Sequence, residues 1–178
     1  MVSPNLDPKN QQLLDSVEAL AREAFPEMPP EKPILGEIID GKDVEIAPNL
    51  RALLERPTTI LATLVNNDTL LGFSMAIPIG EMDPRRADES SDTAYVYFTT
   101  IDKEHQGQGL VGQLQRDMEQ LLRDQGYKFL EEDVMVGNGY AASVVKHYGE
   151  SIVHSYGHDK FKLGQQLAVR IDLSKLPA

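Results

Sequence analysis

The residues from 106 to 112 are the part of this sequence best suited to bind an anionic ligand, because three glycines lie among them. Glycine has no Cβ, so backbone N–H groups beside it can approach a ligand oxygen closely. The same residues open a predicted helix, whose first N–H groups are unpaired and carry a partial positive charge. Such a turn binds a phosphate or diphosphate without a lysine. The residues are Gln106, Gly107, Gln108, Gly109, Leu110, Val111 and Gly112.

Two common phosphate-binding patterns can be compared with this turn. The P-loop requires Lys and then Ser or Thr after its last glycine, whereas Gln113 and Leu114 follow Gly112, so we exclude it. The dinucleotide pattern G-x-G-x-x-G matches residues 107–112, and Asp133 lies about 20 residues further on. A predicted hairpin precedes the turn, however, instead of alternating strands and helices, so a dinucleotide-binding enzyme is the weaker alternative. A tight connection in which glycine serves only the turn is also open.

The turn also resembles the signature of the GNAT superfamily of acyl-CoA-dependent N-acetyltransferases, Gln/Arg-x-x-Gly-x-Gly/Ala. Val111 stands where the family has Gly or Ala, and the small residue Gly112 follows it. A second family block, Asn and then Ala three residues later, is matched by Asn138 and Ala141. The resemblance covers roughly residues 58–173. It implies an α+β fold whose mixed, mostly antiparallel sheet has splayed fourth and fifth strands and is flanked by helices.

The resemblance also implies a cosubstrate and a reaction. Acetyl-CoA would donate an acetyl group to a primary amine, on a small molecule or a peptide, by direct attack of the amine on the thioester. A lysine-like amine has a pKa of about 10.4, so a base helps it to react, and an acid helps the thiolate to leave. The residues that would hold the pantetheine arm are Thr99, Thr100, Ile101 and Asn138, and those that would hold the diphosphate run from Gln106 to Gly112.

The family's two usual proton carriers are replaced in this chain. The frequent basic Glu maps to Tyr97, and the frequent acidic Tyr maps to Val145. We predict Tyr148, near the end of the same short helix, as the substitute acid; a half-buried structural tyrosine would give the same pattern. The weaker candidates for the acid are Tyr140 and His147, and the candidates for the base are Glu131, Glu132 and Asp133. Strand alternation separates the middle one of these three carboxylates from the other two.

These replacements keep an alternative function open. A chain that binds acyl-CoA through the glycine turn, but lacks the usual carriers at Tyr97 and Val145, could be a non-catalytic acyl-CoA-binding or sensing module. Coenzyme A binding without release of thiol to any amine would favour the module over the enzyme.

Hydrophobic periodicity predicts the elements that position these residues. We expect helices at 8–25 (begun by Asp7 and Pro8), 48–56, 110–125 (closed by Gly126) and 141–147, and strands at 59–65, 69–79, 94–101, 129–136, 151–156 and 166–173. Prolines and glycines predict an irregular connection at 26–48, and polar residues predict a surface loop at 80–92. All of this fits one domain, 1–178.

Composition excludes several classes of function. The 17 basic and 28 acidic residues give a net charge of −11, which disfavours nucleic acid as a partner. The absence of cysteine excludes disulfides, thiolate metal sites and a cysteine nucleophile. His105, His154 and His158 lack the spacing of a metal site, so we expect no metal. No apolar run reaches the roughly 18 residues of a membrane helix, and no signal pattern opens the chain, so we expect a cytoplasmic protein without membrane contact.

The acceptor is the least determined part of the prediction. Residues 26–48 carry four carboxylates, and if these line the acceptor pocket, a polyamine, an aminoglycoside or a lysine-like amine would fit. They are Glu37, Asp40, Asp43 and Glu45. Solvated carboxylates on a polar connection are the other interpretation. The resemblance leaves a homodimer open as the assembly.

Overall fold

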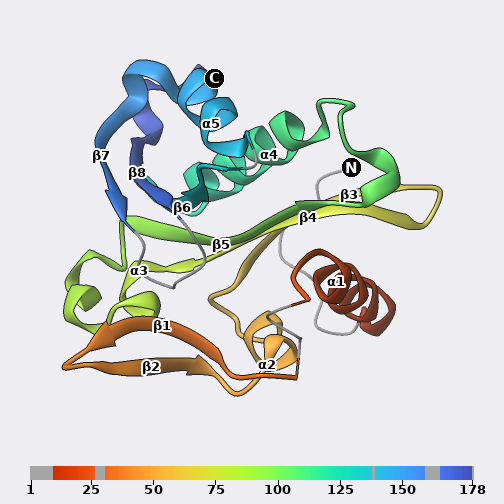
Figure 1. The fold of residues 1–178 in the computed structure, drawn as a ribbon, viewed down its shortest axis with the longest axis horizontal. Coiled ribbons are helices and arrows are strands. Elements are labelled where there is room, and N and C mark those ends of the chain that lie inside the picture. Colours follow the sequence, from red (N-terminus) through yellow and green to blue (C-terminus); the bar gives the residue numbers. More distant parts are fainter. Residues whose placement is uncertain (1–9, 27–30, 138, 159–164, 178) are drawn as a thin grey trace.

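The computed structural model describes residues 10–26, 31–137, 139–158 and 165–177. Six strands form its central sheet: β3 (Ile60–Asn66), β4 (Thr69–Pro78), β5 (Thr93–Ile101), β6 (Phe129–Met135), β7 (Ile152–His158) and β8 (Gln166–Asp172). Their order is β3-β4-β5-β6-β8-β7, and every neighbouring pair is antiparallel except β5 and β6 (Figure 1). This mixed sheet confirms the predicted α+β class. It is not the doubly wound parallel sheet on which the dinucleotide alternative depends.

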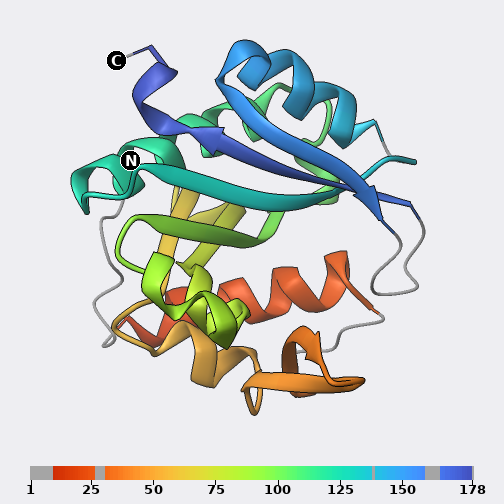
Figure 2. The same ribbon diagram turned by 90° about the vertical axis from the view of Figure 1, so that its left-hand side faces the viewer.

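Helices cover both faces of the sheet (Figures 1 and 2). One face carries α4 (Leu110–Asp124) and α5 (Tyr140–Tyr148), whose inner residues, such as Leu114 and Val144, are fully buried. The other face carries α1 (Gln11–Ala24), α2 (Leu50–Leu54) and a hairpin, and it buries Leu14, Leu53 and Phe73. Within the described ranges, no helix is both long and apolar enough to cross a membrane.

Two boundaries differ from the prediction. The first helix begins at Gln11, because the Asn10 side chain accepts a hydrogen bond from the Leu13 amide at 3.1 Å and so caps the helix. The predicted cap, Asp7, lies outside the described residues. The predicted loop at 80–92 contains two short helical segments, α3 (Ile79–Met82) and the 3-10 helix η1 (Pro84–Glu89).

The prediction of an irregular connection at 26–48 is wrong for its second half. Residues Ile34–Ile39 (β1) and Lys42–Ala47 (β2) pair as an antiparallel hairpin. Its turn uses Asp40 and Gly41, both with positive φ (51° and 75°), as tight hairpin turns require.

The feature that matters most for function is the divergence of β5 and β6. They pair in parallel from Thr93 opposite Phe129 to Val96 opposite Glu132, and the pairing stops there. The β4–β5 register shifts at the same point. Met75 and Ala76 are consecutive on β4, but their partners on β5, Phe98 and Val96, are two residues apart. Such a bulge bends the strand that carries it, so β5 turns away from β6. The strands that the family counts as its fourth and fifth are β5 and β6 here, so the predicted splay is confirmed.

Candidate active site

A groove opens where β5, the loop after it, and the first turns of α4 and α5 meet. We call it the helix-end groove; its volume is about 1030 Å³. Of the residues predicted to hold a cosubstrate, it is lined by Thr99, Thr100, Ile101, Gln106, Gly107, Gly109, Leu110, Val111 and Gly112. Gln108 is not among its lining residues, and Asn138 lies outside the described residues. The structure thus brings together most of the residues that the sequence singled out.

The loop into the groove is shaped by glycine backbone and by two side-chain contacts. Gly107 and Gly109 have φ values of 74° and 77°, and an added Cβ at either would meet no atom within 4 Å. Glycine is therefore needed here for its left-handed conformation and not for close packing. Asp102 accepts hydrogen bonds from the Glu104 amide (2.9 Å) and from Nδ1 of His105 (2.8 Å). These contacts hold the loop in shape ahead of the helix.

The divergence of the sheet exposes one edge of β5 to the groove. Residues Thr99 to Ile101 still pair with β4 on their other side, whereas the described part of β6 pairs with β5 only as far as Val96. This edge of β5 is therefore open to an extended ligand, although the Ile101 carbonyl already accepts a hydrogen bond from Nε2 of Gln106 at 3.1 Å. The Thr99 hydroxyl lies 2.9 Å from that of Ser74, so this side chain is held against the sheet.

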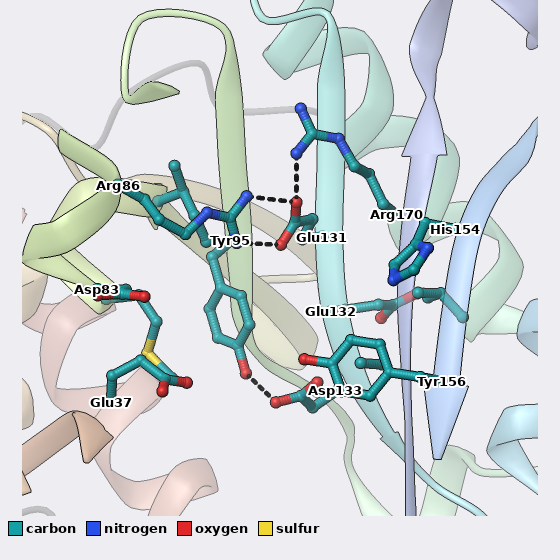
Figure 3. Close-up of a pocket in the computed structure, with 14 residues that line it drawn as sticks. Glu37, Asp83, Arg86, Tyr95, Glu131, Glu132, Asp133, His154, Tyr156 and Arg170 are labelled. Carbon is teal, nitrogen blue, oxygen red and sulfur yellow. Dashed lines mark hydrogen bonds and ion pairs between the residues drawn. The ribbon is translucent and has the colours of Figure 1, made fainter. Parts of the chain in front are cut away.

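A second cavity, of about 330 Å³, lies beside β6; we call it the carboxylate cavity (Figure 3). The polar and aromatic residues that line it are Glu37, Asp83, Arg86, Tyr95, Glu131, Glu132, Asp133, His154, Tyr156 and Arg170. They come from the hairpin, the segment after β4, and strands β5 to β8. Of the four carboxylates expected on residues 26–48, Glu37 lines this cavity and the other three do not.

Both arginines of the carboxylate cavity are already paired. Arg86 donates to both oxygens of Glu131 at 2.8 and 2.7 Å, and Arg170 donates to Glu131 at 2.9 Å and to Glu89 at 2.8 Å. Arg86 also contacts Glu89, and these hydrogen bonds lower the pKa of Glu89 to about 2. Glu131 is therefore engaged by two guanidinium groups, and it is poorly placed to act as a base.

The remaining carboxylates of the cavity differ in their partners. Asp133 accepts a hydrogen bond from the Tyr95 hydroxyl at 3.0 Å (Figure 3). Asp83 accepts hydrogen bonds from the Arg85 side chain, which lower its pKa below the usual range. Both carboxylates line the cavity, where they are suited to attract a cation.

Glu132 points to the opposite face of β6 and is 5% exposed. The Tyr140 hydroxyl donates to its Oε2 at 3.3 Å, and its Oε1 has no hydrogen-bond partner in the described structure. Burial, with smaller contributions from the charges of Asp133 and Glu119, raises its pKa to about 7. A carboxyl group that changes charge near neutral pH is suited to proton transfer.

The predicted acid, Tyr148, lies in the core rather than at either opening. It is 3% exposed, and burial raises its pKa well above the usual value. Tyr140 and His147, the weaker candidates, do line the helix-end groove, and Nε2 of His147 lies 2.9 Å from Oε1 of Glu119. The two family positions are unsuited to proton transfer here. Val145 is exposed and has no ionisable group, and the Tyr97 hydroxyl is engaged because it donates to the Leu35 carbonyl at 2.7 Å.

Sequence reasoning missed several residues of the carboxylate cavity, above all Tyr95, Arg86 and Arg170. Strand alternation alone could have placed Tyr95 on one face of its strand. Only the register of β5 on β6 shows that this is the face of Asp133. His105 and His154 line different openings, and the described residues contain no group of three His, Cys, Asp or Glu that could hold a metal ion.

Comparisons with known proteins give a family and several neighbours. The model of the acetyltransferase (GNAT) family matches residues 14–149. An aminoglycoside 6'-acetyltransferase type Ii structure has a TM-score of 0.66 and 16% identity, over 100% of this chain and 99% of that one. An aminoglycoside 6'-N-acetyltransferase complexed with coenzyme A has a TM-score of 0.62 and 15% identity, over 100% of this chain and 99% of that one. A putative acetyltransferase from Salmonella typhimurium with its cofactor acetyl-CoA has a TM-score of 0.64 and 14% identity, over 100% of this chain and 97% of that one. No curated protein matches.

Proposed function

Since the chain belongs to the GNAT acetyltransferase family and so uses acetyl-CoA, we propose that it acetylates a primary amine that enters through the carboxylate cavity. The observation that carries this proposal is the divergence of β5 and β6. It lies between a glycine-lined helix terminus, suited to a diphosphate, and a cavity rich in carboxylates, suited to a cation. An acetyl thioester held at the divergence would be reached by an amine from the other side.

The helix-end groove fits acetyl-CoA by its chemistry. The amides of the groove-lining residues Gly107, Gly109, Leu110 and Val111 would supply hydrogen-bond donors and the positive end of α4 for a diphosphate. The free edge of Thr99 to Ile101 supplies donors and acceptors for the amide-bearing arm. The bound cosubstrate would supply an acetyl group as a thioester, which a neutral amine attacks directly. Asn138 remains a proposed contact to the arm on the sequence resemblance alone.

The carboxylate cavity favours an acceptor with more than one positive charge. Its two arginines are balanced by Glu131 and Glu89. Arg85 pairs with both Glu37 (3.2 Å) and Asp83 (2.8 Å), so it balances only one of these two carboxylates, and with Asp133 the cavity keeps an excess of negative charge. The Tyr156 ring, 52% exposed, adds an aromatic surface that attracts an ammonium group. A polyamine or an aminoglycoside meets these requirements, and two of the structural neighbours act on aminoglycosides by their names.

The acid in this reaction is better assigned to Tyr140 than to Tyr148. Only Tyr140 lines the groove in which the thiolate would form. Deprotonating a lysine-like amine at pH 7 costs roughly 4–5 kcal/mol, so a base on the acceptor side is also useful.

Thermal unfolding with coenzyme A tests the groove. At 100 times the dissociation constant, coenzyme A should stabilise the wild type by about 2.7 kcal/mol. Gly109→Ala and Gly126→Ala form a matched pair, because both glycines have positive φ (77° and 88°) and lie at opposite ends of α4. Each substitution should lower stability by about 1–2 kcal/mol. Only Gly109→Ala should weaken coenzyme A binding, by about tenfold.

Acetyl transfer is measured as thiol release from acetyl-CoA with a panel of polyamines, aminoglycosides and lysine peptides. We expect turnover with the polycationic acceptors. Equal loss of coenzyme A affinity in both glycine variants, or no thermal shift in the wild type, would contradict the groove. A normal shift with no thiol release from any amine would favour the non-catalytic acyl-CoA-binding module.

A further inference from the structure

One hydrogen bond connects the lining of the carboxylate cavity to the lining of the helix-end groove. Glu132 belongs to the cavity lining, but its side chain points to the face of β6 opposite Glu131 and Asp133. There the hydroxyl of Tyr140, which lines the groove, donates to Oε2 of Glu132 at 3.3 Å. The two residues come from different elements, β6 and α5, which meet beside the divergence of the sheet. A proton that moved along this bond would pass from the acceptor side to the cosubstrate side.

Packing alone does not explain a carboxylate at position 132. Its neighbours on the same face of β6, Leu130 and Val134, are both buried and apolar. Glu132 has no ion pair within the described part of the chain, and its Oε1 is buried without a partner. Burying such a group is costly unless it is paired or becomes neutral. An aliphatic residue would stabilise this position better, which indicates a role in chemistry.

We propose that Glu132 and Tyr140 form a proton relay, in which Glu132 takes the proton that the attacking amine loses and Tyr140 gives one to the departing thiolate. This relay rests on the proposed acetylation of an amine. It goes beyond that proposal by assigning both proton transfers to one connected pair.

The relay balances without any other reactant. The nitrogen lone pair of a neutral amine forms the bond to the acetyl carbon, and the carbon–sulfur bond breaks with its electron pair on sulfur. The N–H proton passes to Oε1 of Glu132, and the Tyr140 O–H proton passes to the sulfur. Rotation of the Glu132 carboxyl group then brings its protonated oxygen to Tyr140, which recovers this proton through their hydrogen bond. The products are the amide and the free thiol, and both side chains return to their starting states.

Protonation of Glu132 would itself prepare Tyr140 to act as an acid. While Glu132 is an anion, the Tyr140 hydroxyl donates to it, and burial and this charge raise the pKa of Tyr140. Once Glu132 is protonated, it becomes a donor, and the hydrogen bond can reverse its direction. The tyrosine proton is then released toward the groove, on the side where the thiolate develops.

The other carboxylates of β6 are less suited to the role. Glu131 is held by two arginines, and Asp133 accepts a hydrogen bond from Tyr95. The charged or titratable groups that act on Glu132 come from every element packed against it: Asp133 on β6, Glu119 on α4, and Tyr140 and Tyr148 on α5. Burial and these groups together give Glu132 a pKa of about 7, so it can change charge near neutral pH.

Glu132→Gln and Tyr140→Phe test the relay, with Glu150→Gln and Tyr127→Phe as controls outside both openings. We expect each relay variant to lower kcat by about 100-fold or more, and KM for acetyl-CoA to stay within about threefold. The wild-type kcat/KM should rise with pH through about 7, and this limb should be lost in Glu132→Gln. The double variant should be no slower than the slower single one, as for residues that act as a unit.

The thermal shift with coenzyme A shows whether each variant keeps a folded groove. If Glu132→Gln does not fold, the kcat of Tyr140→Phe decides the test. Unchanged rates in the variants, an unchanged pH profile in Glu132→Gln, or additive losses in the double variant would overturn the relay while amine acetylation by the wild type stands. Absence of turnover by the wild type with every amine would overturn the proposed function and the relay with it.

Discussion

Three consecutive carboxylates on β6 meet three different environments, and their chemistry differs accordingly. Glu131 is bound by two arginines, Asp133 by the Tyr95 hydroxyl, and Glu132 is buried on the other face beside Tyr140. Strand alternation separates the middle residue from its neighbours, and that much is predictable from the sequence. Which face is buried, and what it meets, depends on the packing of α5 over the sheet.

The position of α5 over the sheet also explains why the sequence alone favours Tyr148 over Tyr140 as the acid. Both lie on one short helix, and both point inward at a helical spacing of eight residues. The sequence does not show which end of α5 lies over the divergence of the sheet. In the structure the first turn reaches the groove, so Tyr140 lines it and Tyr148 packs in the core.

Glu132→Gln should stabilise the protein in a pH-dependent way. The folded-state pKa of Glu132 is about 7, above its ordinary value near 4.5, so the folded state holds this proton more tightly than the unfolded state. The stability it supplies is full below about pH 4.5 and is lost as the pH rises through 7. At pH 8 the variant should therefore be more stable than the wild type, by about 3 kcal/mol.

Urea denaturation at pH 8 and near pH 4.5 measures this difference, which should almost vanish at the lower pH. Glu150→Gln, an exposed substitution of the same type, should change stability little at either pH. A Glu132→Gln variant less stable than the wild type at pH 8 would contradict the assigned environment of this carboxyl group.

At the scale of elements, the hairpin at residues 34–47 shows how local signals can mislead. Prolines favoured an irregular connection, yet Pro33 and Pro48 flank the two strands without interrupting them. Proline removes one N–H donor only where it stands, so it ends a strand without preventing its neighbours from pairing. The Asp40-Gly41 pair was the better signal, because tight hairpin turns favour this dipeptide. The long amphipathic helix α4 and the β3–β4 hairpin, by contrast, follow directly from periodicity and turn residues.

Arg86 ties the segment after β4 to the sheet, so its loss should loosen one wall of the carboxylate cavity. Arg86→Met leaves Glu131, whose side chain is 16% exposed, with Arg170 as its remaining partner. We expect the free energy of unfolding to fall by about 1–3 kcal/mol. KM for the amine should rise, while KM for acetyl-CoA should stay close to the wild-type value, because Arg86 does not line the helix-end groove.

Arg22→Met is the matched control, since Arg22 pairs with Glu31 on the surface, both about two-thirds exposed or more (67% and 70%). Its cost should stay below about 1 kcal/mol, with both KM values unchanged. Denaturation and steady-state kinetics on the two variants give the comparison. Equal effects of the two substitutions would show that the Arg86 network does not shape the cavity.

For the whole molecule, the two openings were predictable to different degrees. The helix-end groove is built from neighbouring residues of one strand, loop and helix, so a local pattern identifies most of it. The carboxylate cavity draws on segments from Glu37 to Arg170 and exists only when the sheet order β5-β6-β8-β7 brings them together. No local spacing encodes that assembly, so the sequence predicted an amine acceptor through its family resemblance and not through the cavity.

Net charge should make the two substrates respond to salt in opposite directions. The chain carries −11 at pH 7, and this field attracts a polycationic amine and repels anionic acetyl-CoA. The screening length falls from about 30 Å at 0.01 M salt to below about 8 Å above 0.15 M. Raising KCl from about 10 to about 300 mM should therefore raise KM for a polyamine about threefold or more. KM for acetyl-CoA should fall or stay constant, because salt screens the general repulsion.

Steady-state kinetics at the two salt concentrations test this, with a monoamine of similar length as the control. The monoamine has one ammonium group instead of several, so its KM should rise less than that of the polyamine. Equal increases in KM for the two amines would mean that the extra charges of the acceptor do not meet Glu37, Asp83 and Asp133. The proposed preference for polycationic acceptors would then be wrong, while transfer to a primary amine would stand on the monoamine's own turnover.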